Sequence, residues 1–250
     1  MQELLNKIHL GDCLEFMRDI PDGSVDMVLC DLPYGTTACK WDTIIPFAPL
    51  WKQYWRVVKS NGAIVLTASQ PFTTALISSQ IDKFKYEWIW KKERPTNPLL
   101  CKKQPPKYHE NICVFYRKQP IFNPTMVKRK EENKRTNKPR KYIDATKVST
   151  DYQDMVLSGN NDLIYGSNIL DISMERGLHP TQKPVALFEY LIKTYTNEGD
   201  TVLDNCSGSG TTAIASYNTE RNFICVEKDP DYHAASVKRL EEHQKQGNLI

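Results

Sequence analysis

The chain has 250 residues, and its hydrophobic and charged fractions of 40% and 25% are ordinary for a soluble globular protein. That length suits one α/β domain with a full core, and the formal net charge of +3 is too small to identify a polyanionic partner. No apolar run approaches the ~18 residues of a membrane span, and the amphipathic N-terminus predicts no signal peptide.

The cysteines predict neither a metal site nor a disulfide framework. They form no CxxC pair, and because their number is odd they cannot all pair with one another. We therefore expect no bound metal and a location in the reducing cytoplasm. The seven are Cys13, Cys30, Cys39, Cys101, Cys113, Cys206 and Cys225.

The first apolar block begins with a strand expected over 8–10, after which Asp12 is placed to cap a helical turn. The continuous apolar run over 25–30 is typical of a buried parallel strand. A helix is predicted over 49–59, and the pair Asn61-Gly62 is expected to end it. Further strands are expected over 63–67, 86–90 and 112–116.

A cationic stretch follows these strands. From 127 to 148 the chain carries nine lysines and arginines against three acids, and almost no large apolar side chain. Such a segment cannot build a core of its own, so we expect a long loop or insertion, either a solvated surface loop or a segment that docks nucleic acid. Its candidate DNA-binding residues are Lys128, Arg129, Lys130, Lys138, Arg140 and Lys141.

The second apolar block continues the alternation of strands and helices. Pro184 opens a helix, and strands are expected over 201–203 and 223–226. A helix over 213–217 lies between these strands, and Asp229 caps a last helix. This alternation predicts a mostly parallel, doubly wound sheet.

The turn after the strand over 201–203 has the pattern of a nucleotide-binding loop. Gly208 and Gly210 allow a tight turn and close approach of a ligand, and Glu227 ends the next strand, where its carboxylate can accept hydrogen bonds from ribose hydroxyls. Alone, this pattern also fits a plain strand-to-helix turn or a nicotinamide dinucleotide. Too little chain follows Gly210 for a dinucleotide domain, so we expect a circularly permuted fold with its nucleotide-binding half last.

The run Asp31-Leu32-Pro33-Tyr34 directly follows the buried strand over 25–30, where α/β sheets place their active sites. The amine of a nucleic-acid base is a poor nucleophile because its lone pair is delocalised. A carboxylate and a backbone carbonyl that accept its two N–H groups favour the pyramidal nitrogen that can attack. Pro33 fixes its own φ, and Tyr34 offers a face to an extruded base. The alternative is a turn that only reverses the chain.

Together these motifs resemble those of the β-class amino-methyltransferases of DNA, which modify adenine N6 or cytosine N4. The catalytic tetrapeptide comes first, then a target-recognition segment and the cofactor glycine motif, and the run over 179–184 resembles the HPTQKP element before that motif. The resemblance covers nearly the whole chain apart from the basic stretch. It implies a Rossmann-like S-adenosylmethionine-dependent methyltransferase fold, circularly permuted, with a seven-stranded, mostly parallel sheet and helices on both faces.

The resemblance also implies a role for each matching residue. Asp31 would bind the target amine, the carbonyl of Leu32 would be the second acceptor beside Pro33, and Tyr34 would stack on the base. Leu32 replaces the family's first proline, which loosens the aim of that carbonyl. For Asp12, capping a helix and contacting the cofactor are equal alternatives. The residues expected at the cofactor are Asp12, His179, Lys183, Asp204, Cys206, Gly208, Gly210, Thr211 and Glu227.

Three regions follow from the resemblance: a catalytic half over 1–95, a strand with the basic insertion as target-recognition region over 96–175, and a cofactor-binding half over 176–250. The expected partners are S-adenosylmethionine, double-stranded DNA within a restriction-modification system and, because relatives often dimerise, a second copy of the chain. Serine commonly replaces the acid in the cytosine enzymes, so Asp31 favours adenine N6. Cytosine N4, an RNA base and a non-catalytic nucleotide-binding regulator remain alternatives.

The basic stretch yields a first prediction. Replacing Lys138, Arg140 and Lys141 with alanine should weaken binding to all DNA sequences alike, because interactions with phosphates carry no sequence information. The slope of log K against log salt should flatten by ~0.9 for each phosphate that the variant no longer neutralises, with unchanged affinity for S-adenosylmethionine. An unchanged slope and affinity would identify a solvated loop and direct the search for the DNA footprint to residues 91–107.

Overall fold

The computed structural model describes residues 1–36, 42–128, 163–175 and 182–247. The chain divides into two compact units, Met1–Asn123 with Asn168–Ile250 and Pro124–Ser167. Within the described part of the second unit, β6 (Met126–Lys128) pairs antiparallel with β7 (Leu163–Tyr165). None of the described helices combines the length and the apolar character needed to cross a lipid bilayer.

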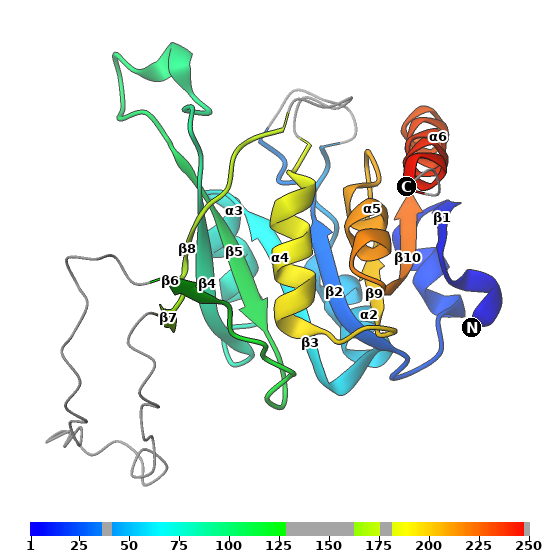
Figure 1. Ribbon diagram of the computed structural model, residues 1–250. Coiled ribbons are helices and arrows are strands. Elements are labelled where there is room, and N and C mark those ends of the chain that lie inside the picture. Colours follow the sequence, from blue (N-terminus) through cyan, green and yellow to red (C-terminus); the bar gives the residue numbers. More distant parts are fainter. Residues whose placement is uncertain (37–41, 129–162, 176–181, 248–250) are drawn as a thin grey trace, which may run out of the picture. The chain divides into compact units, whose positions relative to one another are not determined.

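The first unit is built on an eight-stranded sheet (Figure 1). Its strands pair in parallel except β5, which runs antiparallel to both of its neighbours. In spatial order the strands are β1 (Lys7–Leu10), β10 (Asn222–Glu227), β9 (Thr201–Asp204), β2 (Val25–Asp31), β3 (Val58–Ala68), β5 (His109–Phe115), β4 (Phe84–Lys91) and β8 (Ile169–Asp171).

Helices cover both faces of this sheet, as predicted. The set on one face is α1 (Cys13–Phe16), α2 (Phe47–Val57) and α3 (Phe72–Ser78), and the set on the other is α4 (Val185–Tyr195), α5 (Thr211–Asn218) and α6 (Pro230–Gly247). Figure 1 shows α4 and α5 in front of the sheet. Short 3-10 turns complete the unit: η1 (Gln2–Leu4), η2 (Met17–Asp19) and η3 (Pro98–Leu100).

Side chains of the central strands alternate between two cores, because successive residues of a strand point to opposite faces. In β2, Val28 and Cys30 pack toward α2, whereas Met27 and Leu29 pack toward α4. All four are fully buried, which explains the continuous apolar run that the sequence shows there.

Strand β2 lies beside β9, although the chain between them includes most of the sheet. Met27 pairs with Val202 and Val28 with Leu203, in parallel. From β9 the chain continues to β10 on one side, and from β2 it continues to β3 on the other. The two strands therefore flank the topological switch point, and the turns that follow them open on the same edge of the sheet.

The expected strand count of seven is wrong by one. The additional strand is β8, which pairs in parallel with β4 at the edge of the sheet. Its three residues, Ile169–Asp171, are too few to show an alternating pattern, and only the central one is buried. Such a strand is set by pairing with an existing edge and leaves little signal in the sequence.

The expected end of the helix over 49–59 at Asn61-Gly62 is also wrong. Helix α2 ends at Val57, and Val58 already has extended backbone with φ −78° and ψ 134°. Val58 pairs with Val25, so β3 begins there and passes through Asn61 and Gly62. Gly62 has a packing role, because a Cβ built on it would lie 2.6 Å from the carbonyl oxygen of Asp26.

This close approach gives a prediction for Gly62→Ala. The added methyl group would meet backbone on β2, so the variant should lose about 1–3 kcal/mol of unfolding free energy, measured by urea denaturation with an unchanged m-value. Gly11→Ala is the matched control, since a Cβ there meets nothing within 4 Å. Equal stability of the two variants would contradict the close approach.

The turn between β9 and α5 is organised by Asp204, which is 3% exposed. Its carboxylate accepts hydrogen bonds from the backbone N–H of Cys206, at 3.1 Å, and from the hydroxyl of Thr212 in the first turn of α5. Burial raises the pKa of Asp204 to about 6, and these hydrogen bonds only partly oppose that shift. The folded chain therefore retains a proton that the unfolded chain, with an ordinary aspartate, releases near pH 4.

Asp204 consequently gives a pH-dependent prediction. As the pH rises from 4 to 7, the contribution of Asp204 to stability should fall, because the unfolded state loses its proton first. The unfolding free energy of the wild type minus that of Asp204→Asn should drop by up to about 3 kcal/mol over this range. Chemical denaturation at several pH values measures this difference, and parallel curves for the two proteins would contradict the raised pKa.

Candidate active site

Strand β2 ends at Asp31 because the following residues cannot continue the ladder. Leu32 is 3% exposed and fills the core on the α2 side, and Pro33 has no N–H to donate. Gly35 then turns the chain with a φ of +67°, and its N–H donates to Oδ1 of Asp42 at 2.8 Å. These contacts leave the carboxylate of Asp31 at the carboxyl edge of the sheet.

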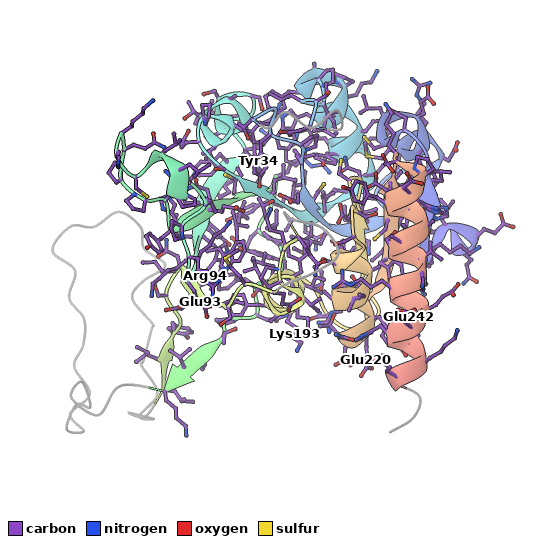
Figure 2. All side chains as sticks on the ribbon, turned by 90° about the horizontal axis from the view of Figure 1, so that it is seen from above. Tyr34, Glu93, Arg94, Lys193, Glu220 and Glu242 are labelled. Atoms are coloured by element: carbon purple, nitrogen blue, oxygen red, sulfur yellow. The ribbon has the colours of Figure 1, made fainter. Side chains whose placement is uncertain are left out.

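Two hydroxyl groups hold one oxygen of Asp31. Tyr34 donates to Oδ1 at 2.7 Å, and Thr67, the residue paired with Asp31 on β3, donates to the same oxygen. The ring of Tyr34 stacks on Phe72, with centroids 5.1 Å apart. Burial, followed by the charges of Asp31 and Glu110, raises the pKa of Tyr34 well above 10, so this hydroxyl keeps its proton. Figure 2 marks the position of Tyr34, seen from above.

The other oxygen of Asp31 is bound by Lys183. Nζ lies 2.5 Å from Oδ2 of Asp31 and 3.4 Å from Oε2 of Glu110, on β5. Lys92 binds the other carboxylate oxygen of Glu110, Oε1. Four charges of alternating sign thus form a row, which runs Asp31, Lys183, Glu110 and Lys92.

Burial and charge act in opposite directions on the pKa values of this row. Burial alone would lower the pKa of Lys183, but Asp31 and Glu110 outweigh it and raise the pKa. Burial would raise the pKa of Glu110, but Lys183 and Lys92 lower it. For Lys92 burial prevails, and its pKa is lowered despite Glu110. Lys183 and Glu110 therefore both stay charged near neutral pH.

The glycine turn after β9 lies on the same edge of the sheet. Gly208 and Gly210 have φ values of +49° and +77°, which favour glycine. The N–H of Gly208 donates to Oε2 of Glu227 at 2.7 Å, and the N–H of Asp229 donates to Oε1 at 2.8 Å. The carboxylate of Glu227 thereby fixes the turn and keeps lone pairs for further donors.

Other residues expected at a cofactor surround this turn. Asp12 caps α1 by accepting from the N–H of Leu14 at 2.9 Å, and its second oxygen lies 3.1 Å from Nζ of Lys228. Burial raises the pKa of Asp12, but these contacts more than offset it and the net shift is downward. Cys206 is half-buried after Asp204, and the hydroxyl of Thr211 donates to the carbonyl of Lys183 at 3.3 Å.

Some of the predicted residues lie outside the part of the chain that the structure describes. They are His179, Arg129, Lys130, Lys138, Arg140 and Lys141. Lys128 is described, and it is the exposed last residue of β6 in the second unit. Among the described residues, no three His, Cys, Asp or Glu side chains gather where they could hold a metal ion.

Sequence reasoning missed Thr67, Glu110 and Lys92. Thr67 ends the strand predicted over 63–67, so the pairing of that strand with the one over 25–30 could have placed it opposite Asp31. Glu110 and Lys92 belong to no motif, and their position depends on the antiparallel pairing of β4 with β5, in which Lys91 faces His109. No signal in the sequence links them to Asp31.

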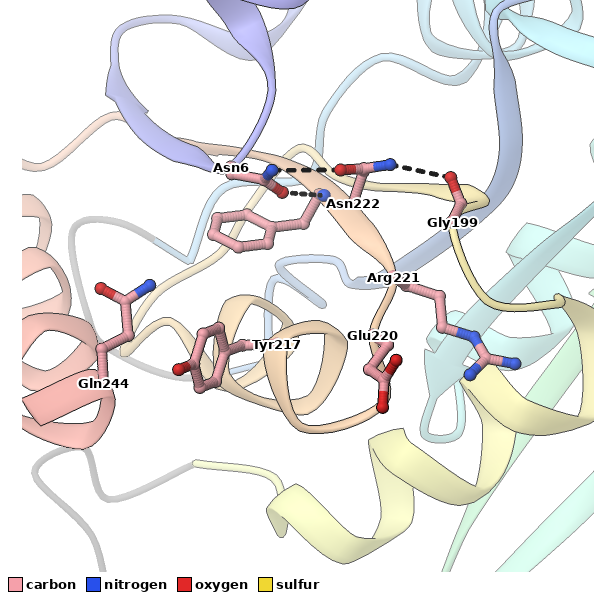
Figure 3. A pocket seen from close by; sticks show the side chains of 8 residues that line it. Asn6, Gly199, Tyr217, Glu220, Arg221, Asn222 and Gln244 are labelled. Atoms are coloured by element: carbon pink, nitrogen blue, oxygen red, sulfur yellow. Dashed lines mark hydrogen bonds between the residues drawn. The ribbon is translucent and has the colours of Figure 1, made fainter. Parts of the chain in front are cut away.

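A hollow of about 400 Å³ lies at the other edge of the sheet, where β9 and β10 begin (Figure 3). Its polar groups bind one another: Asn6 donates to Asn222 at 3.0 Å, and Asn222 donates to the carbonyl of Gly199 at 2.8 Å. This hollow is distant from the carboxyl ends of β2 and β9, where the predicted residues gather.

Comparisons with known proteins agree with this arrangement. The type II methyltransferase M2.MboI of Moraxella bovis is 26% identical over 265 aligned positions, which cover 94% of this chain and 87% of that protein. The crystal structure of the M1.HpyAVI–SAM complex is 25% identical and has a TM-score of 0.63. The alignment covers 94% of this chain and 99% of that one. The structure of the PvuII DNA methyltransferase, which is cytosine-N4-specific, is 17% identical and has a TM-score of 0.66. The alignment covers 95% of this chain and 89% of that one, and at this identity it shows only that the two share a fold.

The match to a protein-family model includes both strands that flank the switch point, β2 and β9. The family described as DNA methylase, N6_N4_Mtase, matches residues 25–238, a range that runs from β2 and Asp31 through the glycine turn into α6. The chain therefore belongs to the N6/N4 family of DNA methyltransferases.

Proposed function

We propose that this DNA methyltransferase transfers the methyl group of S-adenosylmethionine to the N6 amine of an adenine flipped out of double-stranded DNA. The observation that carries the proposal is the position of Asp31. Its carboxylate ends β2 directly beside β9, so the acceptor carboxylate and the glycine turn flank one switch point. This arrangement can bring two substrates together, which is a large part of catalysis of a bimolecular reaction.

In this proposal Asp31 accepts one N–H of the target amine, and the backbone carbonyl of Leu32 accepts the other. These two bonds favour the pyramidal nitrogen and turn its lone pair toward the methyl group. Tyr34 and Thr67 fix the orientation of Asp31 by donating to Oδ1. Phe72 covers one face of the Tyr34 ring, so the base would stack on the other face.

The residues around the glycine turn fit a nucleoside cofactor. Glu227 retains free lone pairs for the ribose hydroxyls, and a Cβ at Gly208 would meet nothing within 4 Å, so the backbone there is open to a ligand. The hydroxyl of Ser207, inside the turn, is buried without a hydrogen-bond partner. Glu227, Gly208, Ser207 and Asp12 would hold S-adenosylmethionine, which supplies an electrophilic methyl group on sulfur.

The DNA would approach the same edge of the sheet. The connection between β4 and β5 extends beyond the sheet (Figure 1) and carries exposed cations. Lys107 ties it to the site by donating to the hydroxyl of Ser69, immediately after β3. Such cations suit contacts with phosphates, alongside those proposed for the basic stretch. The exposed cations of this connection are Arg94, Lys102 and Lys103, and Lys91 is exposed at the end of β4.

Digestion of the methylated DNA distinguishes adenine from cytosine. The chain would be incubated with S-adenosylmethionine carrying a labelled methyl group and with PCR-amplified DNA, which has no methylated base. Label in N6-methyladenine supports the proposal, and label in N4-methylcytosine identifies the second candidate. Calorimetry that detects no binding of S-adenosylmethionine, but tight binding of a nicotinamide dinucleotide, would overturn both.

The role of Asp31 gives the prediction for this site. Asp31→Ala should reduce methyl transfer at least ~100-fold, because the group that binds the reacting amine acts on the chemical step. Affinity for S-adenosylmethionine, measured by calorimetry, should stay within a few-fold of wild type. Near-normal turnover of Asp31→Ala would show that another group binds the amine.

A further inference from the structure

The row of Asp31, Lys183, Glu110 and Lys92 contains more charged groups than the proposed reaction uses. Only Asp31 has a role in it so far. Lys183 and Lys92 are each 6% exposed and Glu110 is 12% exposed, so water compensates little of their charge. Buried charges are costly unless each has a partner, which raises the question of what this row does.

The position of Lys183 conflicts with the use of Asp31 as an acceptor. Its ammonium group lies 2.5 Å from Oδ2, and the hydroxyls of Tyr34 and Thr67 already occupy Oδ1. The amine nitrogen gains positive charge as it bonds to the methyl group, and an ammonium beside its acceptor opposes that charge. Withdrawal of Lys183 from Oδ2 when the amine binds would remove this opposition and leave that oxygen to the amine.

Glu110 offers Lys183 a second position. Its Oε2 is buried, has no hydrogen-bond partner and lies 3.4 Å from Nζ of Lys183. Rotation of the flexible lysine stem toward Oε2 and away from Asp31 would give a charge-assisted hydrogen bond of ~2.8 Å to Glu110 and take Nζ off Oδ2. A buried acceptor without a donor is unfavourable, so this bond would offset part of the bond that Lys183 gives up at Asp31.

We propose that Lys183 moves from Asp31 to Glu110 when the target base enters, and that Glu110 is the positioning residue that frees Asp31 for the amine. The inference rests on the proposed function of Asp31. Lys183 has a carboxylate partner in both positions, so its charge is never buried alone. Lys92 holds Glu110 in place through Oε1.

Two further observations indicate that Lys183 moves away from Asp31 as an ammonium group and does not lose its proton. Asp31 and Glu110 raise the pKa of Lys183, so the ammonium stays protonated and cannot clear Oδ2 by becoming neutral. Nζ also lies 5.7 Å from the centre of the Tyr34 ring, an attraction that keeps the cation near both carboxylates.

The first variant is Glu110→Gln, which keeps the shape of the side chain and removes its charge. Single-turnover methyl transfer to PCR-amplified DNA, at saturating S-adenosylmethionine, should slow by at least ~10-fold, because Lys183 stays on Asp31. Affinity for the cofactor should remain close to that of wild type, whereas the unfolding temperature should fall because Lys92 loses its counter-charge, so the rates are compared well below that temperature. Glu242→Gln is the matched control, since Glu242 is exposed on α6 (Figure 2) and the rate should be unchanged.

The second variant adds Lys183→Met to Glu110→Gln. If Lys183 is what obstructs Asp31, the double variant should transfer methyl groups several-fold faster than Glu110→Gln alone. A double variant that is no faster would show that Glu110 only balances charge, and would overturn the inference. An unchanged rate for Glu110→Gln would overturn it too, whereas absence of transfer by wild type would refute the proposed function itself.

Discussion

The parallel pairing of β2 with β9 is the interaction on which the rest of the structure depends. It joins the two halves of the chain, and it brings the end of β2, with Asp31, next to the glycine turn. Asp26 strengthens the join, because its carboxylate accepts from the N–H of Thr201 at 3.0 Å and binds Lys59 of β3 at 2.6 Å. One side chain thus links three neighbouring strands, and their carboxyl ends form a common edge.

Much of this architecture could be predicted because each strand and helix carries a local signal. The run Val25–Asp31 is apolar on both faces and so indicates a buried strand, and Pro184 and Asp229 mark where α4 and α6 begin. The errors fall where tertiary packing overrides local preference. Gly62 is a helix terminator by type, but here it lies inside β3 because β2 passes too closely for any side chain.

The candidate site could be predicted only as far as its motifs reach. Asp31, Tyr34 and Glu227 lie at strand ends within recognisable runs, so sequence and topology suffice to bring them to one edge. The position of the charge at the end of a long side chain cannot be predicted in this way, because a lysine stem spans several ångströms. The motif places Lys183 beside the glycine turn, and its carbonyl does accept from Thr211 there, but its ammonium lies on Asp31 and Glu110. The alternating order of Asp31, Lys183, Glu110 and Lys92 depends on distances between atoms that the spacing of residues in the sequence does not encode.

The pairing of β1 with β10 has a consequence for how the chain folds. Lys7 lies opposite Ile224, so the first strand of the described sheet along the chain has its only neighbour in the last one, β10. Pairings between residues so distant in sequence carry a large entropic cost of loop closure and form late. During synthesis, β2 and β3 can pair as soon as both have left the ribosome, whereas β1 remains an unpaired strand until β10 follows. The edge formed by β1 and β10 would therefore consolidate after β2 and β3 have already paired.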